Sequence, residues 1–68
     1  MDEADAVTDG LDRVKAAAGG GSALAGALGI NKSAVSRWKR VPIEHVHTIE
    51  RLFNVPRLVQ RPDVFGND

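Results

Sequence analysis

The 68-residue chain contains no cysteine, which excludes disulfides and thiolate metal sites. It has no apolar run near the ~18 residues that a membrane-spanning helix needs. Its acidic first ten residues lack the basic start and apolar middle of a signal peptide. A chain this short lies near the lower size limit for folding without disulfides or metals, so its core must come from helix packing or from a partner chain. We therefore expect a single cytoplasmic domain over residues 1–68, with disorder at residues 1–6 and 66–68.

The sequence also lacks the constellations of side chains that catalysis or metal binding requires. His45 and His47, two residues apart on an expected helix, point about 200° apart and cannot share one ion. Ser33 and Ser36 have no nearby base to activate a hydroxyl as a nucleophile. The triple glycine at 19–21 follows no strand and precedes no Gly-Lys-Ser/Thr, so we interpret it as a helix stop rather than a phosphate-binding loop. We predict a protein that is not an enzyme, with no metal, cofactor, small-molecule substrate or membrane partner.

The formal net charge is zero, but the charges are unevenly distributed. Residues 1–12 carry five acidic side chains and no Lys or Arg. Residues 13–61 carry all nine Lys and Arg against two Glu, a net charge of +7, and four of the positive charges lie within residues 32–40. Such a chain can present a basic face to nucleic acid although its total charge vanishes. The alternative is that these charges only solvate the surface.

Residues 22–40 show the pattern of two short helices joined by a tight turn. Apolar side chains recur at i, i+1 and i+4 in both segments: Leu24, Ala25 and Leu28, then Ala34, Val35 and Trp38. Gly29 suits a left-handed helix end, Ile30 can supply the apolar contact that accompanies it, and Asn31 is a good N-cap for the second segment. The small side chain at position 25 suits two helices that cross closely. The pattern predicts a helix-turn-helix.

One helix is expected before this unit, over residues 8–18, where apolar side chains recur at helical spacing. Thr8 or Asp9 can cap this helix, and Gly10 weakens its start by about 1 kcal/mol relative to alanine. Ser22 is the expected N-cap of the helix that follows the triple glycine.

A further helix is expected over residues 42–53, with a proline as its first residue, and one more turn over residues 56–60. The helix presents five apolar side chains on one face: Ile43, Val46, Ile49, Leu52 and Phe53. Residues 61–65 are expected to form an extended tail, because a residue before proline avoids the helical region. Val64 and Phe65 then dock on their own domain or on a second copy. The predicted fold is all-α, a small bundle of four to five short helices.

The outer side of the helix expected over residues 32–40 carries side chains that suit DNA. Hydrogen-bond donors recur there at i, i+1, i+4 and i+5: Lys32, Ser33, Ser36 and Arg37. A major groove about 12 Å wide admits one helix, so these donors are expected to reach base edges, the two cations preferring guanine O6 and N7. Phosphate contacts, which fix register without specifying sequence, are expected from a second set: Ser22, Asn31, Lys39 and Arg40. Arg13 and Lys15 are expected to flank them.

The stretch LAGALGINKSAVSRWK resembles the helix-turn-helix of phage Cro-type repressors and of the YdaS-like antitoxin/regulator family. It matches their pattern of Leu-Ala, then Leu-Gly-Ile/Val, then Ala-Val-Ser followed by Trp. RPDVF, at residues 61–65, is similar to a tail that follows in YdaS-like proteins. The resemblance covers residues 11–65 and implies a lambda-repressor/Cro-like fold and the same four reading residues. It also implies a transcriptional repressor of a phage, prophage or toxin–antitoxin locus, which occludes a promoter at the nucleoid of a bacterial host.

A single small module buries little surface on DNA, and helix-turn-helix proteins usually bind palindromic half-sites as dimers. The expected partners are therefore a double-stranded DNA operator and a second copy of the chain, the homodimer forming on DNA. The short chain and the apolar stretch at residues 55–65 support this hypothesis.

Two other functions compete with duplex-DNA binding. A protein-interaction module, either an antitoxin or a polymerase-binding adaptor, is supported by the acidic N-terminus and the zero net charge. An RNA or single-strand binder needs exposed aromatic rings, and only Trp38, Phe53 and Phe65 are aromatic. We interpret Trp38 as part of the core, because it continues the stripe of Val35; the alternative is a stacking platform for a base.

Overall fold

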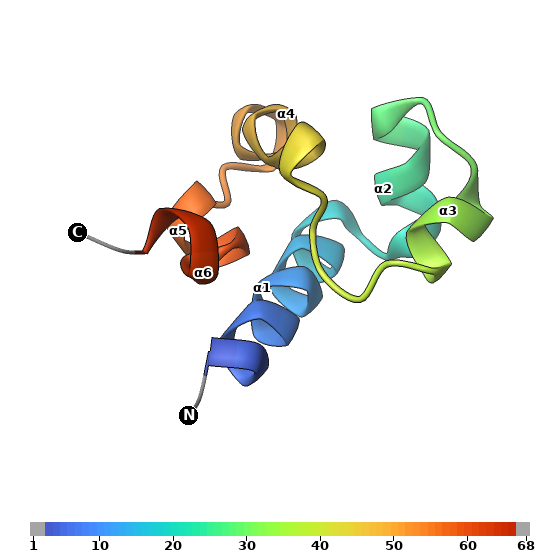
Figure 1. The fold of residues 1–68 in the computed structure, drawn as a ribbon. Coiled ribbons are helices and arrows are strands. Elements are labelled where there is room, and N and C mark those ends of the chain that lie inside the picture. Colours follow the sequence, from blue (N-terminus) through green and yellow to red (C-terminus); the bar gives the residue numbers. More distant parts are fainter. Residues whose placement is uncertain (1–2, 67–68) are drawn as a thin grey trace.

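The computed structural model describes residues 3–66, and this part of the chain is helical without any strand (Figure 1). Its elements are α1 Glu3–Ala18, α2 Gly21–Leu28, α3 Lys32–Ser36, α4 Ile43–Phe53, α5 Arg57–Gln60 and α6 Pro62–Phe65. The all-α prediction is confirmed. The described part holds six helices, whereas four to five were expected.

Within residues 3–66, no helix combines the length and the apolar character that crossing a lipid bilayer requires.

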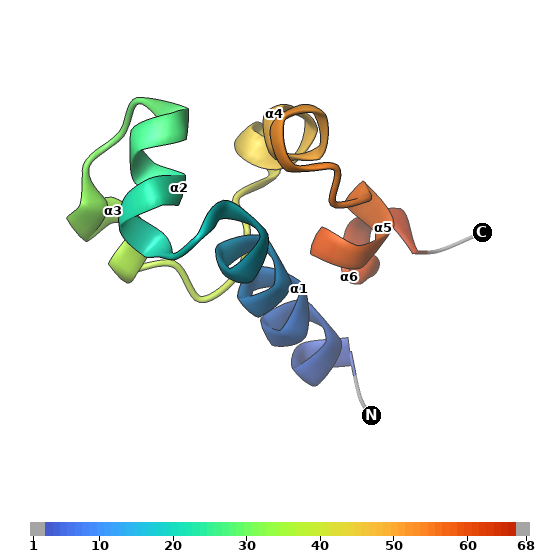
Figure 2. The ribbon, with the colours of Figure 1, turned by 180° about the vertical axis from the view of Figure 1, so that it is seen from behind.

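The first helix is the element on which most of the others pack. α1 contacts α2, α4, α5 and α6, whereas α3 packs on α2. Figures 1 and 2 show α3 beside α2 at one end of the molecule, with α5 and α6 at the opposite end. The outer side of α3 therefore lies away from the C-terminal helices.

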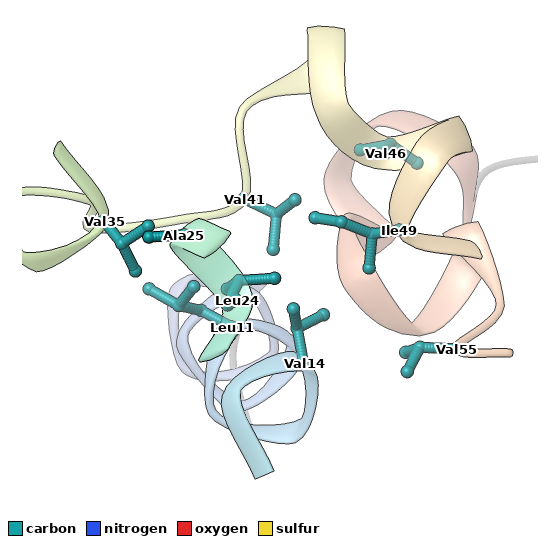
Figure 3. Close-up of a cluster of buried hydrophobic side chains, with 9 residues drawn as sticks. All are labelled: Leu11, Val14, Leu24, Ala25, Val35, Val41, Val46, Ile49 and Val55. Carbon is teal, nitrogen blue, oxygen red and sulfur yellow. The ribbon is translucent and has the colours of Figure 1, made fainter. Parts of the chain in front are cut away.

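Nine buried apolar side chains form one core between these helices (Figure 3). They come from α1 to α4 and from the connections around α4: Leu11, Val14, Leu24, Ala25, Val35, Val41, Val46, Ile49 and Val55. Leu24, Val41 and Ile49 are fully buried and point toward one another in Figure 3. Val41 belongs to no helix, so the connection between α3 and α4 is itself part of the core.

The start of α1 differs from the prediction. The helix begins at Glu3 rather than at Thr8, so neither Thr8 nor Asp9 is its cap. Val7 is buried, and α6, a helix that the sequence did not predict, packs on α1. These tertiary contacts support the extra N-terminal part of α1, for which the sequence offers no local capping signal. Disorder was expected at residues 1–6 and 66–68; within these ranges α1 spans residues 3–6, and Gly66 is the C-cap of α6. Residues 1–2 and 67–68 lie outside the described part.

The turn between α2 and α3 follows the prediction closely. Gly29 is left-handed (φ 70°, ψ 28°), and the Ile30 N–H donates to the Ala25 carbonyl at 3.0 Å. This is the hydrogen bond of a glycine-terminated helix end. The side chain of Asn31 caps α3 by accepting from the Ser33 N–H at 3.0 Å. Ala25 is buried at the crossing, as expected.

The start of α2 corrects another prediction. The helix begins at Gly21, and its N-cap is Gly20, without any side-chain hydrogen bond, so Ser22 is not the cap. Gly20 has φ 116°, a conformation that side-chain-bearing residues rarely adopt, and its carbonyl accepts from the Leu24 N–H at 3.0 Å. The glycine run therefore starts the helix through its backbone.

The second half of the chain departs from the prediction at two of its three prolines, Pro42 and Pro62. Pro42 has extended backbone (φ −61°, ψ 137°) and is the N-cap of α4 rather than its first residue. Pro62 is the first residue of α6, so the extended tail predicted for residues 61–65 is wrong. The restriction imposed by proline falls on Arg61 alone (φ −138°, ψ 75°), and the missing N–H of Pro62 costs nothing at a helix start. The C-cap of α4 is Asn54, which is left-handed (φ 58°).

The apolar face of α4 is narrower than predicted. Ile43 and Leu52 are 51% and 53% exposed, whereas Phe53 packs against the core. Phe65 also packs against the core, so the end of α6 docks on its own domain, while Val64 is 41% exposed.

Candidate nucleic-acid interface

The four predicted base-reading side chains are exposed and lie together. Lys32, Ser33 and Ser36 belong to α3, and Arg37 is its C-cap. At 100° per residue these positions span an arc of about 140° on a helix. Val35 lies on the opposite side and is 1% exposed. We call these four residues the α3 surface; it carries two cations and two hydroxyls, and it is held by a core residue behind it.

Local hydrogen bonds set which groups the two serines present outward. The Ser33 hydroxyl donates to Asn31 Oδ1 at 3.0 Å, and the Ser36 hydroxyl donates to the Lys32 carbonyl at 3.2 Å. Both hydroxyl protons are thus engaged within α3, and the oxygen lone pairs remain to accept. In this arrangement the serines suit amino donors on base edges, whereas Lys32 and Arg37 suit acceptors.

α3 is shorter than the helix predicted over residues 32–40 and ends at Ser36. The Arg37 N–H is shared between two carbonyls at 3.2 Å, and the Trp38 N–H donates to the Val35 carbonyl at 3.1 Å, so the last turn tightens. The chain then turns inward to bury Val41 completely. A helical pattern cannot anticipate this turn, because it depends on where the core lies. Lys39 is therefore outside the helix.

The predicted phosphate-binding side chains are all exposed, but they come from three different local structures. Ser22 lies in the first turn of α2, Asn31 is the cap of α3, and Lys39 and Arg40 lie in the connection to α4. The N-terminus of α2 is close to α3, because a Cβ placed on Gly21 would lie 3.7 Å from Val35 Cγ1. The structure therefore places the first turn of α2, which holds Ser22, next to α3.

The two flanking cations on α1 are less available than the sequence indicates. Arg13 Nε donates to Asp9 Oδ2 at 2.6 Å, one helical turn away, which offsets its charge locally. Lys15 is partly buried. Neither lies on the helix-turn-helix.

Trp38 is partly buried and packs against the core, in line with its interpretation as a core residue. Its ring stacks on that of His45, with centroids 5.6 Å apart and an angle of 29° between the planes. His47 instead lies edge-on to Phe65 at 6.0 Å. The two histidines therefore have separate ring partners.

Two buried polar residues near the C-terminus were missed by the sequence analysis. Gln60 is fully buried, and its Nε2 donates to the carbonyls of Val46 at 3.1 Å and Val55 at 2.8 Å. Arg61 is 7% exposed. The only sequence signal was the RPDVF stretch, which indicated family resemblance but no contact, because the carbonyls involved are brought together by the fold.

Arg61 forms a bidentate ion pair that also reaches the α3–α4 connection. Its Nε and Nη2 donate to the two carboxylate oxygens of Asp63 at 2.8 and 2.6 Å, and its Nη1 donates to the Val41 carbonyl at 3.0 Å. The hydrogen bond from Arg61 lowers the pKa of Asp63, opposed by partial burial and assisted by the charges of Arg61 and Arg40. The Asp63 hydrogen bond in turn raises the pKa of Arg61.

The lowered pKa of Asp63 predicts a loss of stability in acid. The ionised carboxylate stabilises the fold above the unfolded-state pKa of about 3.9, and this contribution disappears as pH falls through the lower folded-state value. Thermal unfolding between about pH 6 and about pH 2 should show Asp63→Asn less stable than the unsubstituted protein at the upper end, the difference shrinking in acid. A difference that stays constant down to the lowest pH contradicts this account.

Comparison with protein families gives a match over most of the chain. No curated protein and no solved structure matches the chain. The family model described as bacterial toxin YdaS matches residues 11–68, a range that holds the whole helix-turn-helix and the Arg61–Asp63 pair. The chain therefore belongs to the YdaS family.

Proposed function

We propose that this YdaS-family protein is a sequence-specific, double-stranded DNA-binding transcriptional regulator that inserts α3 into the major groove. The observation that carries the proposal is the α3 surface, where two cations and two hydroxyls lie exposed on one face at the outer end of the molecule. A groove about 12 Å wide admits a helix with such donors and acceptors. No catalytic step is part of the proposal.

The residues around α3 support a phosphate-contacting role beside base reading. Lys39 and Arg40 are exposed just beyond Arg37, and Ser22 lies beside α3 at the N-terminus of α2. Contacts of this kind position a protein on the duplex and carry no sequence information. Asn31 adds its amide group, since its oxygen is engaged as the α3 cap.

The proposal extends to a homodimer on DNA and to repression by promoter occlusion. A five-residue α3 reads few base pairs, so useful specificity requires two half-sites about 34–36 Å apart. Promoter occlusion follows from the resemblance to Cro-type repressors. A regulator of this kind acts on the chromosome, which places it in the cytoplasm at the nucleoid.

Arg37→Ala and Lys39→Ala are expected to affect DNA binding in different ways. Arg37→Ala should relax the base preference at one position of the site and cost about 1–3 kcal/mol on the cognate duplex. Lys39→Ala should weaken cognate and scrambled duplexes by the same factor. Fluorescence anisotropy with both duplexes measures the difference. If both substitutions act alike on both duplexes, the assignment of the α3 surface to base reading is wrong.

A protein-interaction module is the second candidate, because the C-terminal half exposes apolar side chains. Leu52, Leu58 and Val64 are 53%, 52% and 41% exposed, and the family model carries the name of a bacterial toxin. A salt titration separates the candidates. Contacts to several phosphates make the logarithm of the binding constant fall linearly and steeply with the logarithm of salt concentration. A flat response, or no binding to any duplex at low salt, favours the interaction module.

A further inference from the structure

The connection between α3 and α4 carries two proposed phosphate contacts, and both belong to neither helix. Lys39 and Arg40 lie in this connection, exposed, directly before the buried Val41. The Val41 side chain is buried in the core, and the Val41 backbone is also held by a residue far away in the sequence. Arg61 Nη1 donates to the Val41 carbonyl across 20 positions of the chain.

The geometry of Arg61 makes this contact a rigid one. Its guanidinium is held in plane by two hydrogen bonds to Asp63, and the third goes to Val41. A planar guanidinium with a bidentate carboxylate has little rotational freedom left. Pro62, between the two charged residues, starts α6 and so fixes the position of Asp63 relative to Arg61. The backbone next to Arg40 is therefore tied to the opposite end of the molecule.

The charge of Arg40 also acts on Asp63. The charge of Arg40 contributes to the lowered pKa of Asp63, so the two side chains lie within electrostatic range. The carboxylate of Asp63 is thus influenced by two cations, its ion-pair partner Arg61 and the proposed phosphate contact Arg40.

Resting on the proposed function, we infer that Arg61 and Asp63 are positioning residues for DNA binding. Their ion pair holds the Val41 backbone and thereby places Lys39 and Arg40 against the DNA backbone. The pair does not itself contact DNA. This role differs from a general contribution to stability, because it acts on one segment and on the phosphate contacts made there.

Arg61→Lys tests this inference without changing the charge of the protein. Lysine cannot reproduce the planar, three-way hydrogen bonding. The matched control is Arg57→Lys, because Arg57 is exposed and lies over the Phe65 ring, away from the connection. For each folded variant, amide hydrogen exchange at residues 39–41 and the salt dependence of binding to one duplex are measured. Amide exchange reports how firmly residues 39–41 are held, and the salt slope reports the number of phosphate contacts.

Arg61→Lys should accelerate amide exchange at residues 39–41. If one phosphate contact is lost, the magnitude of the salt slope should fall by about 0.9, which corresponds to about eightfold weaker binding at 0.1 M salt. Arg57→Lys should change neither. If Arg61→Lys does not fold, Asp63→Asn is measured in the same way. Unchanged exchange, or faster exchange with an unchanged slope, overturns the inference and leaves the proposed function standing. Failure of the unsubstituted protein to bind any duplex overturns both.

Discussion

Gln60→Glu is expected to lower the free energy of unfolding by about 4 kcal/mol at neutral pH. Gln60 is fully buried, and its Nε2 donates to the carbonyls of Val46 and Val55. A carboxylate in its place directs an oxygen at two carbonyl oxygens and buries a charge that no cation offsets. Gln60 Oε1 already lacks a hydrogen-bond partner within the described residues, so the site offers no donor to the new group.

The cost of Gln60→Glu should depend on pH in the direction opposite to that of Asp63. Burial raises the pKa of the introduced carboxyl above its unfolded value of about 4.3, so the deficit is smallest below that pH and grows as pH rises through the folded-state pKa. The control is Gln60→Met, which loses the same two hydrogen bonds without adding a charge and should cost about 1–3 kcal/mol at every pH. Denaturant unfolding across the pH range measures all three proteins. Equal stability of the two variants at neutral pH rules out the burial argument.

Gly10→Ala should destabilise the protein by about 3 kcal/mol, although alanine favours helix formation. Gly10 lies in the interior of α1, where replacement by alanine ordinarily gains about 1 kcal/mol. Here a Cβ would collide with the Val59 carbonyl oxygen and lie 2.6 Å from that of Gln60. Both obstacles are backbone atoms of α5, so α1 and α5 must move apart to admit the methyl group.

Gly26→Ala is the matched control for Gly10→Ala. Gly26 also lies inside a helix, α2, but a Cβ there meets nothing within 4 Å. Thermal or denaturant unfolding should show Gly26→Ala as stable as the unsubstituted protein or up to about 1 kcal/mol more stable. Two glycine substitutions with the same sign and size would mean that α1 and α5 do not approach as closely as described.

At Gly10 the local signal in the sequence and the tertiary packing lead to different expectations. From the sequence, Gly10 was predicted to weaken the start of a helix, which is a local property. In the structure it is the place where two helix backbones meet, which depends on the packing of α5 on α1. Local propensity therefore gave the wrong sign for the expected effect of alanine at this position.

The helix-turn-helix could be predicted because its signals are local. Gly29 ends α2 through its own conformational freedom. Asn31 caps α3 through a hydrogen bond to a residue two positions along the chain. The exposure of the α3 surface follows from helical periodicity once Val35 is assigned to the core. These parts of the candidate site required no knowledge of distant contacts.

The length of α3 and the role of the C-terminus could not be predicted in this way. α3 ends at Ser36 because Val41 must reach a core built from α1, α2 and α4. One hydrogen bond of the Arg61 side chain goes to a carbonyl 20 positions away. No pattern of apolar spacing encodes such a partner, so RPDVF was interpreted as an extended tail.

Selection of bound duplexes from a random pool tests the central claim most directly. If the α3 surface reads base edges as a dimer, the unsubstituted protein should enrich one sequence with two-fold symmetry and half-sites about 34–36 Å apart. Enrichment of no sequence, together with no retention of any duplex at low salt, would contradict the claim that this surface binds DNA.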